Sequence, residues 1–324
     1  MRWTIAGRQR HRDGMSLLLV LMTMMSHPAA ALAGPIDATG ARDSGLSARR
    51  PHIERQAPAR FRAKPPEKHY SVTVPIGRAK PALPLPRIEG PDDARLPLVV
   101  IDAGHGGHDP GALSPHNGKR EKDITLALAR AIRDDLVASG RVRVALTRSD
   151  DRYLLLEERS GIARRLQADL FISIHADAAE NEEARGASIY TLSETASDRE
   201  AARIAARENR ANIINGVDLG AHSNEVSSIL VDLTQRETMN RASDFARLLQ
   251  REAAEAVTFR TTAHRFASFV VLKAPDTPSI LFETGFISNK DDGEFLASAA
   301  GQKKVARGVR EAVQVHFARR VAAR

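Results

Sequence analysis

The sequence of 324 residues has no cysteine, and aromatic residues make up only 4% of it. Without cysteine the chain can form neither a disulfide framework nor a thiolate metal site, so any bound metal must be held by His, Asp or Glu. Long apolar runs are also lacking, since the run at residues 15–25 is far too short to cross a bilayer. With 42% hydrophobic residues, the chain still has enough apolar side chains for a globular core. We therefore expect a globular protein without stable membrane insertion.

The first residues have the three parts of a secretory signal peptide. Four arginines within the first twelve residues precede the apolar run, and the small residues AALA follow at positions 30–33. This order predicts a signal peptide over residues 1–33. The arginines are not adjacent to one another, which favours Sec-type export. The alternative is an uncleaved anchor that lies on the membrane surface.

Residues 34–96 differ in composition from the rest of the chain. They carry twelve Lys or Arg against seven Asp or Glu, and residues 34–97 hold 11 of the 16 prolines. Such a segment cannot bury enough apolar surface to offset its ordering entropy, so we expect a disordered or extended basic linker. Either the linker attracts anionic lipid or cell-wall polymers through long-range electrostatics, or it is merely solvated.

The formal net charge of +8 does not extend to the C-terminal part of the chain. Residues 97–324 carry 32 basic and 32 acidic side chains. The positive excess lies in residues 1–96, where nothing resembles a helix-turn-helix or an RNA-binding motif. We therefore expect no nucleic-acid partner.

After residue 97, apolar runs typical of buried strands alternate with patterns of helical period. Strands are expected at 96–104, 142–148, 168–177, 186–192, 269–274 and 279–285, and helices at 122–140, 154–167 and 299–321. Continuous apolar runs are typical of a sheet that is covered on both faces. We predict a single α/β domain over residues 97–324, with helices on both faces of a twisted, mostly parallel sheet. Residues 199–257 form a helical insertion, either a structural cover or a functional lid.

Four ionisable residues lie at or just after the ends of predicted strands. His105 follows VVIDAG and Glu121 begins the next helix. His175 comes directly after LFISI, and Glu283 comes directly after SILF. Sites in open α/β sheets gather at the carboxyl ends of strands. Two imidazoles and a carboxylate are the ligands of a catalytic zinc, and a second carboxylate could accept a proton from the metal-activated water. Taken singly, each histidine could equally be a hydrogen-bonded structural residue, and His108 could be a rim residue that contacts substrate.

These residues stand in four blocks that resemble a known family. The blocks are IDAGHGGHDPGA (101–112), REKDITLALA (120–129), FISIHADA (171–178) and LKAPDTPSILFETGFISN (272–289). In order and separation they resemble the signature blocks of the zinc-dependent N-acetylmuramoyl-L-alanine amidases, amidase type 3, of the bacterial cell wall. The resemblance covers residues 96–323. It implies zinc held by His105, Glu121 and His175, with Glu283 as the catalytic glutamate.

The resemblance also implies the reaction and the place where it occurs. The substrate would be peptidoglycan, cut at the amide between the lactyl group of N-acetylmuramic acid and the L-alanine of the stem peptide. With the predicted signal peptide, this implies a periplasmic enzyme of cell-wall remodelling and daughter-cell separation.

Part of the insertion resembles the regulatory helical region of the division-associated members. In those members a glutamate occupies the zinc until an activator with a LytM-type domain removes it. Position favours Glu208 for this role, with Glu225 as the second choice, and the alternative is that both are surface glutamates on an amphipathic cover. Residues 34–96 are too short and proline-rich for the β-rich targeting domain that many such members carry.

Two other functions remain open from the residues alone. The domain could be a non-catalytic cell-wall scaffold, although the complete set of four site residues argues against it. It could also be a zinc peptidase that cuts within the stem peptide, because activation of water is the same for either amide.

Overall fold

The computed structural model describes residues 84–211 and 228–322, without the side chains of residues 228–233. The predicted signal peptide, residues 34–83 of the predicted linker and Glu225 lie outside the described residues.

The strands form a seven-stranded mixed sheet within the described residues. They are β1 (Ile88–Glu89), β2 (Leu98–Ala103), β3 (Arg143–Leu146), β4 (Leu170–His175), β5 (Ala187–Leu192), β6 (Phe259–Ala267) and β7 (Ser279–Glu283). Their order is β1-β3-β2-β4-β7-β5-β6. The pairs β1–β3 and β5–β7 are antiparallel, and the other four neighbouring pairs are parallel. The mostly parallel sheet predicted from continuous apolar runs is confirmed.

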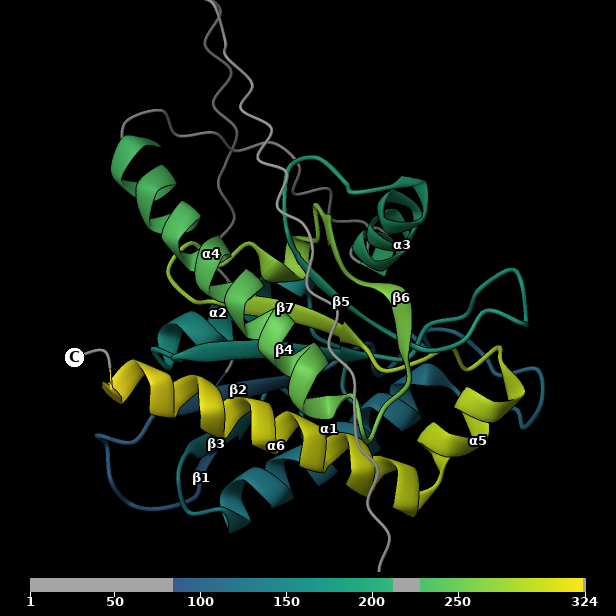
Figure 1. Cartoon of the computed structure of the whole chain (residues 1–324), viewed down its shortest axis with the longest axis horizontal. Helices are drawn as coiled ribbons and strands as arrows, with labels where there is room; N and C mark the ends of the chain where they lie inside the picture. The colour runs from purple at the N-terminus through teal and green to yellow at the C-terminus, as the bar shows by residue number, and fades with distance from the viewer. Residues whose placement is uncertain (1–83, 212–227, 323–324) are drawn as a thin grey trace, which may run out of the picture. The chain divides into compact units, whose positions relative to one another are not determined.

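Helices cover both faces of this sheet, as predicted. They are α1 (Glu121–Ala138), α2 (Leu156–Arg165), α3 (Arg199–Asn209), α4 (Ser228–Ala253), α5 (Lys290–Ala297), α6 (Ala299–Ala322) and the 3-10 helix η2 (Val270–Leu272). On one face α1, α4 and α6 share a core with alternate strand residues such as Val99 and Ile101. On the other face α2, α3 and η2 pack around Val100 and Phe171. Figure 1 shows α4 and α6 in front of the strands.

The sheet brings the predicted site residues to one edge. β2, β4 and β7 are parallel neighbours, so their carboxyl ends lie side by side. In this register His175, the last residue of β4, stands directly beside Glu283, the last residue of β7. Glu121 lies near the same edge because it is the first residue of α1, which begins directly after the loop that leaves the carboxyl end of β2.

One predicted strand is a different element. Residues 269–274 contain η2 instead of a strand, with Phe269, Val271 and Leu272 buried in the core on the α2 side. The strand beside β5 at the end of the sheet is β6, whose exposed and buried residues are mixed. A short apolar run does not distinguish a strand from a buried turn by periodicity, and a strand at the end of the sheet has less apolar character.

Two predicted boundaries also differ from the structure. Residues 88–89, expected in the linker, form β1 and pair with Ala145 and Val144 of β3. The folded domain therefore begins before residue 97. In the predicted insertion 199–257, Phe245 and Leu249 of α4 lie in the core shared with α6, so the second half of α4 belongs to the domain core.

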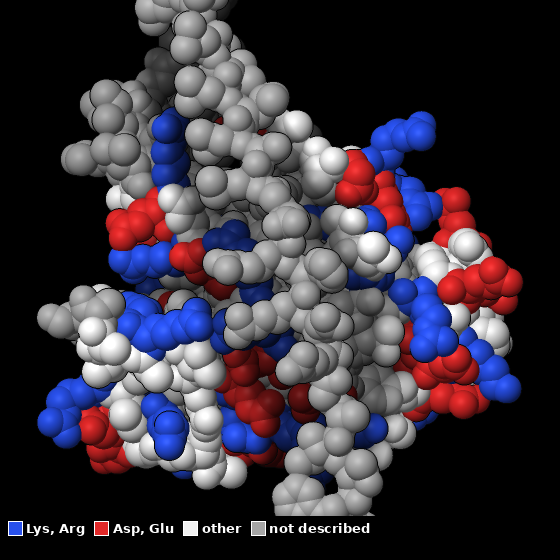
Figure 2. Space-filling view, viewed as in Figure 1, with Lys and Arg blue, Asp and Glu red and all other residues white. Residues whose placement is uncertain are grey.

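The described surface agrees with the balanced charge of residues 97–324. Basic and acidic side chains lie intermixed over the described part of the face drawn in Figure 2. In the described parts of the chain, no helix combines the length and the apolarity needed to cross a membrane.

Candidate metal centre

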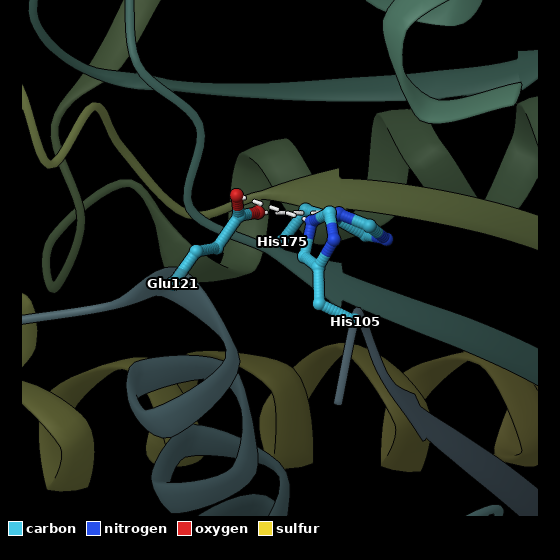
Figure 3. A group of neighbouring side chains, drawn as sticks. All are labelled: His105, Glu121 and His175. Atoms are coloured by element: carbon cyan, nitrogen blue, oxygen red, sulfur yellow. Dashed lines mark hydrogen bonds and ion pairs between the residues drawn. The ribbon is translucent and has the colours of Figure 1, made fainter. Parts of the chain in front are cut away.

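Three of the predicted site residues meet at the carboxyl edge of the sheet. His105 follows β2, Glu121 is the first residue of α1, and His175 ends β4 (Figure 3). His105 Nε2 lies 3.1 Å from Glu121 Oε2, and His175 Nδ1 lies 3.3 Å from Glu121 Oε1. All three side chains are at most 8% exposed. Their nitrogen and oxygen atoms lie within 4.8 Å of one another, close enough to share one metal ion.

Two glycines permit this close approach. A Cβ atom on Gly104 would lie 2.5 Å from Cε1 of the His175 ring, closer than real contacts allow. A Cβ on Gly111 would lie 2.7 Å from both Glu121 and His105, and Gly111 also has a φ of +64°. The glycines of the first block therefore make room for the ligand side chains as well as for a tight turn.

His105 is oriented through its other ring nitrogen. Its Nδ1 lies 2.9 Å from Asp109 Oδ2, which assigns the proton to Nδ1 and leaves Nε2 to face the cluster. Among the described residues, no hydrogen-bond partner is found for this buried Nε2. Burial disfavours the charged ring, but the Glu121 and Glu208 carboxylates outweigh it and raise the pKa of His105 well above its ordinary value. A metal cation would satisfy the same negative potential, so the donor set fits a metal.

Glu121 is fixed by the main chain on two sides. Its Oε2 accepts a hydrogen bond from Ala112 N at 2.9 Å, and its Oε1 accepts one from Ala176 N at 3.0 Å. Burial opposes ionisation, yet His105 and His175 lower the pKa of Glu121 well below its ordinary value. Glu121 is therefore a charged, preoriented carboxylate.

Glu283 lies beside the cluster with one oxygen held and one without a partner. Its Oε2 accepts a hydrogen bond from Asp177 N at 3.1 Å. Its buried Oε1 has no hydrogen-bond partner among the described residues. Burial, reinforced by the charges of Glu121 and Glu208, raises the pKa of Glu283 well above its ordinary value. A carboxyl group with a raised pKa is suited to exchange a proton with substrate or water.

Glu208 reaches the same cluster from α3. Its Oε2 lies 3.5 Å from His105 Nε2 and 3.2 Å from His175 Nδ1. Only 5% of Glu208 is exposed. With His175 and Glu283 it forms a second group that could hold a metal ion. Glu208, the first choice from the sequence, thus lies next to the cluster, and its inhibitory role stays a prediction; Glu225 lies outside the described residues.

The sequence analysis missed several residues that surround the cluster. Asp109 holds His105, and buried Asp177 forms an ion pair with Arg207 of α3. Arg148 and Arg159 are buried beneath the His105 loop. Asp109 and Asp177 lie within the quoted blocks, four and two residues after a predicted ligand, so their position was an available signal. His108, expected at the rim, contacts Tyr153, with ring centroids 4.3 Å apart and the rings tilted by 37°.

An open α/β sheet that gathers two imidazoles and a carboxylate at the carboxyl edge, next to a buried carboxyl group, defines a metal-dependent hydrolase. Comparison with known families gives the same class and makes it specific. The model of the N-acetylmuramoyl-L-alanine amidase family matches residues 99–315, and the chain belongs to this family.

Relatives and solved structures agree with this assignment. The chain is 37% identical over 221 residues to the amidase AmiA of Escherichia coli K12, covering 68% of this chain and 76% of AmiA. It is 35% identical over 223 residues to AmiC of Neisseria meningitidis MC58, covering 68% of this chain and 53% of AmiC. The chain thus spans about half the length of AmiC.

Two solved amidases have similar folds. The catalytic domain of CwlV from Bacillus (Paenibacillus) polymyxa var. colistinus is similar with a TM-score of 0.52 at 25% identity, covering 69% of this chain and 99% of CwlV. AmiC2 of Nostoc punctiforme is similar with a TM-score of 0.51 at 26% identity, covering 68% of this chain and 97% of AmiC2.

Proposed function

We propose that this chain is a peptidoglycan hydrolase that cleaves the amide between N-acetylmuramic acid and the L-alanine of the stem peptide. The observation that carries the proposal is the convergence of His105, Glu121, His175 and Glu283 at one sheet edge, in a chain that belongs to the amidase family. Each residue comes from a different segment of the chain. If these residues had only structural roles, each would need its own separate reason to lie at this edge of the sheet.

His105, Glu121 and His175 would hold the metal, with zinc as the ion that best matches two imidazoles and one carboxylate. When bound, zinc would lower the pKa of a water molecule and polarise the scissile carbonyl. The chain contributes the orientation of the ligands. Asp109 keeps the His105 ring turned inward, and two main-chain N–H groups hold Glu121.

Glu283 would move the proton. As a carboxylate it accepts a proton from the attacking water, and as the acid it passes this proton to the departing amine nitrogen of L-alanine. The hydrogen bond from Asp177 N fixes one oxygen, so the other can face the reacting atoms. Its raised pKa makes its carboxylate a stronger base toward the attacking water than that of an exposed glutamate.

We further propose that α3 holds the enzyme in a closed state. Glu208 places its carboxylate between the two histidines, where the substrate carbonyl would otherwise approach. An activator with a LytM-type domain would displace α3 and shift the population to an open state. A cell-wall hydrolase with a low basal activity is safe until its partner arrives.

The remaining parts of the chain would determine where in the cell the enzyme acts. Residues 1–33 would direct export to the periplasm, and the basic segment before the catalytic domain or the activator would bring the enzyme to the division site. The catalytic domain would act there in daughter-cell separation.

Digestion of purified sacculi by the full chain, with and without an activator, tests the proposal. The expected products are free stem peptides that begin with the amino group of L-alanine, and Glu283→Gln is the matched inactive control. Loss of activity with a chelator and its return with zinc are also expected. New ends within the stem peptide would support a peptidase instead, and binding without cleavage in any condition would support a scaffold.

A further inference from the structure

The loop that carries His105 has an uncommon backbone conformation. His105, Gly106 and Gly107 have φ angles of 60°, 125° and 60°, so three residues in succession have positive φ. Glycine adopts such angles freely, whereas a histidine does so only when its surroundings hold it there. The direction of the His105 side chain therefore depends on what contacts the backbone of this loop.

Arg159 of α2 is the main contact beneath His105. Its Nη2 donates to the His105 carbonyl oxygen at 2.8 Å, and its Nη1 donates to the Ala103 carbonyl oxygen at 2.7 Å. Nη1 also pairs with Asp102 at 3.0 Å, and Nε donates to the Leu154 carbonyl oxygen at 3.2 Å. The side chain is 2% exposed. One guanidinium thus connects the end of β2 with the carbonyl group of the predicted metal ligand.

Arg148, at the end of β3, completes the contact to this segment. Its Nη2 donates to the Gly104 carbonyl oxygen at 2.7 Å, and its Nε donates to that of Ala103 at 2.9 Å. Burial and the nearby Arg159 charge lower the pKa of Arg148 to about 10. The two arginines together bind the carbonyl oxygens of residues 103, 104 and 105.

Asp102 anchors Arg159 from the sheet. Its Oδ1 accepts a hydrogen bond from Thr147 at 2.5 Å as well as pairing with Arg159, and its Oδ2 accepts one from Ser173 at 2.7 Å. Asp102 is completely buried, and burial opposes its ionisation, but the Arg159 charge outweighs this and lowers the pKa of Asp102. The carboxylate that pairs with Arg159 is therefore fixed by Thr147, which follows β3, and by Ser173 of β4.

A buried ion pair of this kind is not explained by stability alone. Removing two charges from water costs free energy, and well-packed apolar residues of similar volume often stabilise a core at least as well. The planar guanidinium of Arg159 donates hydrogen bonds to the carbonyl oxygens of Ala103 and His105 at the same time, and a lysine cannot reproduce this geometry. The contacts therefore indicate a role in orienting the loop.

We propose that Arg159 is a positioning residue for the metal centre. By holding the His105 carbonyl oxygen, it keeps the backbone in the conformation that directs Nε2 toward Glu121 and His175. The proposal rests on the proposed function, because it takes these three residues as the metal ligands. Arg159 itself does not touch the metal or the substrate.

Measurement of Zn²⁺ affinity distinguishes a positioning role of Arg159 from a role in general stability. Arg159→Lys and Arg159→Met are compared with wild type and with Arg164→Met, in which an exposed arginine of the same helix that pairs with Asp276 is replaced. Zn²⁺ dissociation constants are measured by competition with a chromophoric chelator, at a temperature where circular dichroism shows each apo protein to be folded. We expect Zn²⁺ to bind about 10–100-fold more weakly to both Arg159 variants, and normally to Arg164→Met.

Asp102→Asn gives a second approach if Arg159→Met does not fold. The amide keeps the shape of Asp102 but removes the charge that anchors Arg159, so we expect a smaller loss of Zn²⁺ affinity. A lower melting temperature with a Zn²⁺ dissociation constant within twofold of wild type, in the folded Arg159 variants, would overturn the positioning role. If the wild type itself binds no Zn²⁺, the proposed metal centre fails first and this inference fails with it.

Discussion

The metal cluster lies between two regions that are held in different ways. On the sheet side, hydrogen bonds with buried groups at or near the ends of strands fix His105, Glu121, His175 and Glu283. On the α3 side, Glu208 depends on this one helix of eleven residues. The sheet side is built into the core, whereas α3 could move without disturbing the ends of β2, β4 and β7.

The contacts of α3 support this difference. Its polar attachments include the ion pair of buried Asp177 with Arg207, whose side chain is 42% exposed, the pairs of Glu200 with Arg260 and Arg265 of β6, and the hydrogen bonds of Asn209 with Ser268 and Val270. Its apolar contribution to the core is small: Ala201, Ile204 and Ala205. Ion pairs with partly exposed partners contribute less to stability than fully buried hydrogen-bond networks, so we expect α3 to be displaced more easily than the strand ends. Changes on the two sides should therefore have opposite effects on activity.

The largest effect is expected on the sheet side from Glu283→Gln. The amide keeps the size of the side chain but cannot accept the proton of water, so amide hydrolysis should fall about 10²- to 10⁴-fold. Turnover of sacculi measures this, and Zn²⁺ binding should remain. Activity within tenfold of wild type would mean that another group moves the proton.

A smaller loss is expected from Gly104→Ala. The added Cβ would lie 2.5 Å from the His175 ring and must displace it, so Zn²⁺ affinity should fall at least about tenfold, as for other changes that misorient a ligand. The control is Gly161→Ala in α2, where a Cβ meets no atom within 4 Å. Equal Zn²⁺ affinities of the two variants would show that the ring tolerates displacement.

On the α3 side, Glu208→Ala should raise activity instead of lowering it. Removal of the carboxylate from the cluster should raise basal hydrolysis of peptidoglycan without activator, about tenfold for a coupling energy of ordinary size. Glu255→Ala, at an exposed position, is the control. Unchanged basal activity would remove Glu208 from the inhibition.

A weaker change of the same sign is expected from Asn209→Ala. The variant loses hydrogen bonds to Ser268 O and from Val270 N, while Glu208 and the other contacts of α3 stay in place. Basal activity should rise less than in Glu208→Ala, and the amount of activator needed for half-maximal activity should fall. A variant with wild-type basal activity and an unchanged need for activator would show that these bonds do not hold α3 closed.

The smallest effect on activity is expected from His316, which lies in neither region. Burial and the Arg320 charge lower the pKa of His316 to about 4, against about 6.5 when unfolded. The unfolded chain therefore binds an extra proton between these values, and stability is lost as the pH falls through this range, by about 2 kcal/mol from pH 7 to pH 5. Urea unfolding at both pH values measures this. His316→Phe should lose this part of the pH dependence and keep its activity at pH 7.

Much of the fold followed from local patterns in the chain. The apolar runs of β2, β4 and β7 and the helical period of α1 and α6 predicted these elements, because each buries its apolar side chains in a way that a short window displays. The prediction of a strand at residues 269–274 was wrong, because the short window does not display how these side chains are buried. Their apolar side chains are buried in a turn, and the short window does not distinguish that turn from a strand.

The sequence blocks were enough to recognise the four candidate site residues. They did not show which other side chains hold these residues in place. His105 and His175 stood at strand ends, where parallel strands bring side chains together. Arg148 and Arg159 lay in segments expected only as a strand end and a helix. Nothing local distinguishes an arginine on a solvated helix face from one buried under a loop 54 residues away.

The sequence by itself determined the elements and the chemical types at their ends, because strand and helix periods and residue identities are local properties. Only the tertiary structure decided how those types meet. Parallel pairing of β2, β4 and β7 placed the ligands on one edge, and the packing of α3 brought Glu208 to within 3.5 Å of His105. Such contacts join residues up to about a hundred positions apart. They depend on the strand order and on which face each helix covers, and a local sequence pattern records neither.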